Sequence, residues 1–148
     1  MHLSTKTNLA MRILMFCAMN PERTVRKAEV ALRCNANVSL VAVVIHQLGL
    51  GGFLKTMRGR GGGIRLNDSP ADVVIGAVFR EFEKTKLLDH TADTCSLIEH
   101  CNLKPLINEA LAAFYDVLDR ETLADLIAGN SELADSLRLP RAKTRSSC

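Results

Sequence analysis

Apolar residues recur at helical spacing through the first part of the chain, and short polar turns separate the runs. The first predicted helix begins at Ser4 or Thr5, either of which can cap it, and ends near Met19. Its apolar positions form one stripe that we expect to be buried: Leu9, Ile13, Phe16 and Cys17. Further helices are predicted over residues 26–34 and 38–48. Asn37 caps the third helix, and Gly49 is expected to end it.

Two short apolar-rich runs then flank a glycine-rich tip in residues 53–66, FLKTMRGRGGGIRL. Glycine allows the backbone to take positive φ and reverse direction, so the pattern predicts a β-hairpin. Arg58 and Arg60 lie near its end, and Lys55 and Arg65 lie on its two strands. Helix, turn, helix and basic hairpin is the order of a winged helix-turn-helix, a DNA-binding unit. We assign residues 1–83 to it, which gives a mostly α fold with a small β-hairpin.

The second half of the chain divides into four segments. Residues 75–83 predict a helix, and residues 84–102 show no sustained period and read as a loop. Residues 103–128 contain a long amphipathic helix over 103–118 and a short following helix. Residues 129–148 are expected to form a disordered tail. We favour a dimerisation role for the long helix, with intramolecular packing as the alternative.

The net charge of +3 conceals an asymmetry between the two halves. Residues 1–66 hold ten Lys and Arg against two Glu, a net charge of +8. Residues 67–148 hold nine Lys and Arg against fourteen Asp and Glu, a net charge of −5. A basic N-terminal half suits a polyanion partner, although a solvated basic face would show the same count. The hairpin favours the first interpretation, with double-stranded DNA as the partner.

Three further classes are not expected from the sequence: membrane proteins, secreted proteins and enzymes. No apolar run approaches the length of about 20 residues that spans a bilayer. The first apolar run carries Arg12 and lacks a cleavage site, so we expect a cytoplasmic protein without a membrane partner. Residues 59–63 lack the GxxxxGK(S/T) pattern of a phosphate loop, and no nucleophile–base pair is evident. We therefore expect no enzymatic activity.

The five cysteines fall into two groups. Cys17 lies in an apolar helical run and is expected in the core, Cys34 ends a predicted helix and is expected to be structural, and Cys148 ends the polar tail as a free thiol. Cys95 and Cys101 lie in the predicted loop, together with His90. Two thiolates and an imidazole are soft ligands suited to a metal, but an uncoupled thiol pair would show the same spacing.

Several longer stretches together resemble the winged-helix regulators of the IscR, NsrR and RirA type, which carry iron–sulfur clusters. They are the opening MHLSTKTNLAMRIL, then VIHQLGLGGFL, MRGRGGGIRL, IGAVFREFE and LDRETLADLI, within residues 1–128. Within this family, the stretches are most similar to the NsrR branch, and this resemblance implies a nitric oxide sensor and repressor. The resemblance implies a homodimer on an operator, with the third helix in the major groove and Arg58 in the minor groove. It also implies phosphate contacts from Ser39, Ser4 and Thr5.

The chain departs from this family at two places. Where the third helix usually carries Asn-His-Leu-x-Lys, residues 39–43 read SLVAV, which offers few groups for base edges. In the loop, His90 occupies the first cysteine position, so the resemblance implies a 2Fe–2S or 4Fe–4S cluster held by His90, Cys95 and Cys101. Asn8 stands where some relatives use a carboxylate ligand. The alternative is a degenerate, cluster-free member that acts through thiols or by pairing with a paralogue.

Overall fold

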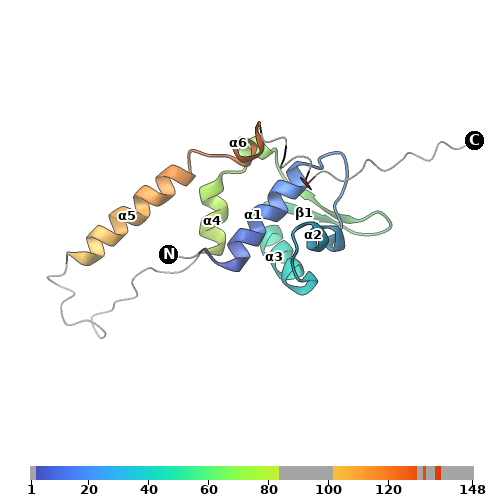
Figure 1. The fold of residues 1–148 in the computed structure, drawn as a ribbon, viewed down its shortest axis with the longest axis horizontal. Helices are drawn as coiled ribbons and strands as arrows, with labels where there is room; N and C mark the ends of the chain where they lie inside the picture. Colours follow the sequence, from blue (N-terminus) through green and yellow to red (C-terminus); the bar gives the residue numbers. More distant parts are fainter. Residues whose placement is uncertain (1–2, 84–101, 130–131, 133–135, 138–148) are drawn as a thin grey trace, which may run out of the picture.

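The computed structural model describes residues 3–83, 102–129, 132 and 136–137 (Figure 1). The predicted order of elements is confirmed, and the fold is a winged helix-turn-helix followed by a long helix. The elements are α1 (Thr5–Ala18), α2 (Lys27–Arg33), α3 (Val38–Leu50), β1 (Leu54–Met57), β2 (Gly63–Leu66), the 3₁₀ turn η1 (Pro70–Asp72), α4 (Ile75–Phe82), α5 (Leu103–Leu118) and α6 (Leu123–Ile127).

Helix α1 lies at the centre of the core. It packs against α3, α4, α6 and β2, and Ile13, Leu14 and Phe16 are completely buried on it. Burial of each such side chain contributes about 1.5–3 kcal/mol, so α1 is the main apolar support of the fold. The hydroxyl of Ser4 accepts a hydrogen bond from the backbone N–H of Thr7 at 3.1 Å, which caps the helix as predicted.

Helices α2 and α3 form the helix-turn-helix and are bent by 115° relative to each other. Asn35 takes a positive φ of 44° in the turn, and the side chain of Asn37 accepts a hydrogen bond from the N–H of Ser39 at 2.8 Å. Helix α3 continues through Gly49 to Leu50, two residues beyond the predicted end. Glycine costs only about 1 kcal/mol inside a helix, which the buried face of α3 offsets.

The hairpin is tied to the body by main-chain hydrogen bonds. Strands β1 and β2 are antiparallel, with Leu54 opposite Leu66 and Met57 opposite Gly63. Val25 exchanges two hydrogen bonds of 2.8 Å with Ile64 and so pairs with β2 outside the hairpin. A Cβ at Gly63 would lie 2.5 Å from the carbonyl oxygen of Val25. This close approach requires glycine and holds the wing at a fixed angle.

The chain after the wing packs against α1 through α4 and α6. Val74 bridges Thr122, and the completely buried Leu123 anchors α6 through an N–H bond of 2.9 Å to Val73. Helix α5 extends away from the body and buries none of its residues fully (Figure 1). Where the structure describes the predicted tail, the carbonyl oxygen of Leu137 accepts a hydrogen bond from Asn20 at 3.0 Å.

None of the described helices is by itself long and apolar enough to cross a membrane. Only α2 and α3 taken together reach that length and apolarity, and they are sharply bent at their junction.

Candidate nucleic-acid interface

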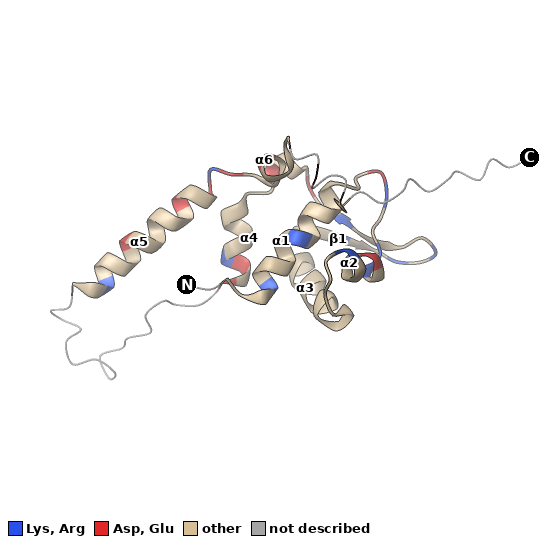
Figure 2. Cartoon of the chain, viewed as in Figure 1, with Lys and Arg blue, Asp and Glu red and all other residues tan. Residues whose placement is uncertain are grey.

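The outer face of the hairpin carries positive charge without a counter-charge. Lys55 and Arg65 are directly opposite in the register of β1 and β2, and both side chains are exposed. Like charges at directly opposed positions destabilise a hairpin. Arg58 and Arg60 add two exposed cations at the tip, and among the described residues no acid forms an ion pair with any of the four (Figure 2). A polyanion would relieve this repulsion.

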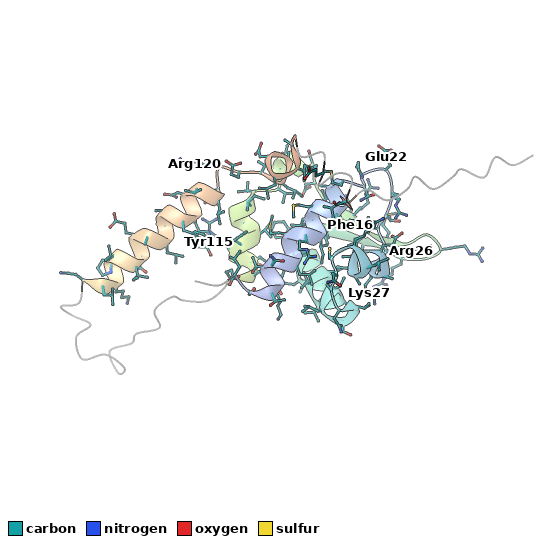
Figure 3. All side chains as sticks on the ribbon, viewed as in Figure 1. Phe16, Glu22, Arg26, Lys27, Tyr115 and Arg120 are labelled. Carbon is teal, nitrogen blue, oxygen red and sulfur yellow. The ribbon has the colours of Figure 1, made fainter. Side chains whose placement is uncertain are left out.

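The start of α2 extends the same positive surface. The bridge between Val25 and Ile64 places the exposed Arg26 and Lys27 next to strand β2, toward the tip of the hairpin (Figure 3). The nearby acid Glu29 pairs with Arg23 at 2.6 Å. Burial raises the pKa of Glu29, but hydrogen bonds from Arg23 and from the N–H of Arg26 outweigh it and lower the pKa below its usual value. Glu29 therefore stays ionised, and its charge is balanced by Arg23.

Helix α3 presents a mainly apolar face to solvent beside these cations. Val41, Val44 and Leu48 are completely buried and fix the orientation of the helix. The side chains on the opposite, solvent-facing side are Val38, Ser39, Ala42, Val43, His46 and Leu50. Ser39, a predicted site residue, is exposed in the first turn of α3, on the same side as Val38.

The two predicted contacts at the start of α1 have different surroundings. Thr5 is exposed, whereas the hydroxyl of Ser4 serves the helix cap and lies 2.7 Å from the hydroxyl of Thr7. The carboxylate of Glu83 accepts hydrogen bonds from the N–H of Ser4 at 2.7 Å and from the hydroxyl of Thr7 at 2.5 Å. These bonds, Thr7 first, lower the pKa of Glu83 against the opposing effect of burial. Glu83 thus occupies the position where a phosphate would meet this helix N-terminus.

Glu83 was not anticipated from the sequence. It lies 79 residues from Ser4 along the chain, and no local pattern marks the contact. Its position is also the last described before residues 84–101.

A second contact that the sequence did not signal joins α4 to α5. The guanidinium of Arg80 donates two hydrogen bonds to the carboxylate of Asp119, at 2.6 and 2.7 Å, and lies 4.3 Å from the centre of the Tyr115 ring. Tyr115 points from α5 toward α4 (Figure 3). A Cβ at Gly76 would overlap the Asp119 carboxylate. The end of α5 is therefore held against α4 by fitted contacts.

The predicted metal ligands His90, Cys95 and Cys101 lie outside the described residues. Within the part that is described, no group of three His, Cys, Asp or Glu side chains is placed to hold a metal ion. Asn8 is exposed on α1.

The two described thiols, Cys17 and Cys34, are both buried, as predicted for Cys17. Burial, with a further contribution from the nearby Cys34, raises the pKa of Cys17 to about 12. Burial also raises the pKa of Cys34, against the opposing charge of Arg12. The guanidinium of Arg12 donates a hydrogen bond to the main-chain oxygen of Cys34. Both thiols are therefore protonated structural groups at neutral pH.

Comparison with known proteins gives consistent results. The sequence profile of the Rrf2 family, described as iron-dependent transcriptional regulators, matches residues 3–129. The chain is 36% identical over 143 residues to the HTH-type transcriptional regulator NsrR of Geobacillus kaustophilus, covering 93% of this chain and 97% of that protein. It is 34% identical over 144 residues to NsrR of Bacillus subtilis, covering 94% and 99%.

Solved structures share the fold. The IscR structure from T. potens superimposes with a TM-score of 0.67 at 23% identity, covering 96% of this chain and 94% of that one. The structure of CymR, the global cysteine regulator of B. subtilis, superimposes with a TM-score of 0.66 at 24% identity, covering 85% and 95%.

Proposed function

The chain belongs to the Rrf2 family of transcriptional regulators, and we propose that it is a dimeric, DNA-binding repressor whose affinity for its operator depends on an iron–sulfur cluster. The observation that supports DNA binding most strongly is the set of exposed cations on the hairpin beside α3, which form no ion pair with any described acid. The signal is nitric oxide or the iron and redox state of the cell.

On DNA, the wing and α3 have separate roles. Arg58 and Arg60 at the wing tip enter the minor groove, whose negative potential attracts guanidinium groups. Lys55 and Arg65 on the strands contact phosphates and fix the register of the protein on the duplex. Helix α3 lies in the major groove, with Ser39 near its start as a further phosphate donor. We assign no phosphate contact to Ser4 or Thr5, because the carboxylate of Glu83 lies at the start of α1.

Helix α5 supplies the dimer interface. Leu103, Leu106 and Val117 are 50–60% exposed on it, an unusual apolar surface for a helix that otherwise projects into solvent. A second copy of α5 would cover these side chains, and two-fold dimers place two winged units on adjacent half-sites. The fitted contacts among Arg80, Tyr115 and Asp119 would then relate the dimer helix to the winged unit.

The proposed cluster is of the 2Fe–2S or 4Fe–4S type, with His90, Cys95 and Cys101 as its ligands. Thiolates are the usual ligands of such clusters, and imidazole replaces them on one iron in some centres, so these three donors suit a cluster whose fourth ligand comes from elsewhere. When bound, the cluster supplies iron that reacts with nitric oxide or oxidants. Residues 84–102 connect α4 to α5 in sequence, so Glu83 and the contact between Arg80 and Asp119 are positioned to relay a change in that segment.

The experiment that tests the cluster is an anaerobic visible absorption spectrum with iron and sulfide analysis. We expect absorption near about 400 nm from thiolate-ligated iron, bleaching with nitric oxide, and loss of the band in a Cys95→Ser/Cys101→Ser variant. A Cys148→Ser variant is the matched control and should keep the band. A colourless, iron-free protein under careful anaerobic handling would contradict the proposal.

One observation favours a second candidate, a degenerate member that acts through thiols or by pairing with a paralogue. The exposed face of α3 offers few groups for base recognition. A mobility shift with the duplex upstream of its own coding sequence separates the two candidates. Specific retardation supports the repressor, and no retardation supports the degenerate member.

A further inference from the structure

The exposed face of α3 is apolar where a DNA-reading helix usually presents hydrogen-bonding groups. Val38 is 47% exposed, Val43 50% and Leu50 76%. Ser39 and His46 are the polar side chains on this face. Covering a half-exposed hydrophobic side chain lowers the free energy, so this face is suited to bind an apolar partner surface.

The residues that discriminate bases by hydrogen bonding are missing from this face. Paired hydrogen bonds from Arg, Lys, Asn, Gln, Asp or Glu distinguish one base pair from another. Helix α3 contains one such residue, Gln47, and its side-chain amide donates to the main-chain oxygen of Glu81 at 3.1 Å. Ser39 bonds to donors and acceptors alike and selects no base. His46 is the one exposed side chain of α3 whose imidazole could also bond a base edge, so any other sequence preference carried by α3 must come from its apolar groups.

Thymine offers the matching surface, because its C5-methyl is the apolar group on the floor of the major groove. We propose that Val38 and Val43 read thymine by contact with these methyl groups, an inference that rests on the proposed DNA binding. The two valines are five residues apart, about 7.5 Å along the helix axis and about 140° around it. They lie on the two flanks of the exposed face, so each should contact a thymine at a different position of the half-site.

The charges around this face favour DNA over a protein partner. Arg26 and Lys27 at the start of α2 continue the positive surface formed by the four cations of the hairpin. The acids among residues 3–66 are Glu22 and Glu29, and Glu29 is paired with Arg23. An apolar strip bordered by cations complements a major groove bordered by phosphates. A second copy of this surface would bring like charges together.

The test uses the full-length chain purified anaerobically. Duplexes are first selected from a random-sequence library, and the enriched duplex is then made with single thymines replaced by uracil, which lacks the methyl group. Fluorescence anisotropy at fixed salt should show binding weakened about fourfold for each contacted methyl, the equivalent of about 0.8 kcal/mol for one buried methyl-sized group. In a Val43→Ser variant, which removes both methyl groups of the side chain, the uracil effect at one position should disappear. Leu126→Ser on α6, 40% exposed and remote from α3, is the matched control and should retain it.

The other outcomes overturn the inference in distinguishable ways. Enriched duplexes that bind equally well with uracil would refute methyl reading and leave the proposed function standing. A Val43→Ser variant that changes oligomeric state without altering the uracil effect would assign the face to a protein contact. If the library yields no enriched duplex, the inference fails together with the proposed function.

Discussion

Replacing Glu83 with Gln should destabilise the fold by loosening the start of α1. The carboxylate accepts hydrogen bonds from the N–H of Ser4 and the hydroxyl of Thr7. A hydrogen bond to a charged group contributes about 1.5–3 kcal/mol when shielded, and a carboxylate at a helix N-terminus adds about 0.3–1 kcal/mol. Because the Glu83 side chain is only partly buried, solvent screening lowers these values. We expect the free energy of unfolding to fall by about 1–2 kcal/mol.

The effect should also depend on pH with a definite sign. The hydrogen bonds lower the pKa of Glu83 in the folded chain below its ordinary value of 4.5. Its stabilisation is therefore complete above that value and is lost as pH falls through the lower folded pKa. Urea unfolding followed by circular dichroism should show the difference between wild type and Glu83→Gln at pH 7 and a much smaller one in acid.

Glu22→Gln provides the control, because Glu22 is exposed on the turn before α2 (Figure 3). It should leave the free energy of unfolding within about 0.5 kcal/mol of wild type. Equal destabilisation by the two substitutions, or a Glu83→Gln effect that persists unchanged in acid, would refute the role assigned to this carboxylate.

Three further substitutions test other parts of the structure. Arg58→Gln should weaken DNA binding across sequences and reduce the slope of log affinity against log salt by about 1, measured by anisotropy; an unchanged slope would remove Arg58 from the interface. Leu106→Lys should convert a dimer to a monomer in sedimentation while leaving the urea midpoint of the winged unit unchanged, and a persistent dimer would exclude this face of α5. Gly63→Ala should lower the free energy of unfolding by about 1–3 kcal/mol, because the new methyl would meet the carbonyl oxygen of Val25.

Local patterns predicted the elements of the fold. Helical spacing of apolar residues located α1, α3 and α5, and the glycine-rich tip located the hairpin, because each signal lies within a few residues of the element it specifies. The burial of Cys17 followed from the same spacing. The prediction that Gly49 ends the third helix was wrong, because the buried face of α3 stabilises a helix that includes a glycine in its last turn.

The contacts that join the elements were not predictable in this way. Val25 pairs with Ile64, Ser4 with Glu83 and Arg80 with Asp119, each across a long stretch of sequence. Such pairs depend on how the elements pack, which no local window records. The ligand set of His90, Cys95 and Cys101 stays a prediction, because it lies outside the described residues.

The measurement that tests the account most directly is DNA affinity before and after exposure to nitric oxide. The anaerobic protein is titrated against the duplex upstream of its own coding sequence, beside the Cys95→Ser/Cys101→Ser variant. The account predicts that nitric oxide weakens binding of the wild type and leaves the affinity of the variant unchanged. Equal affinity of the wild type with and without nitric oxide and oxidants would contradict it.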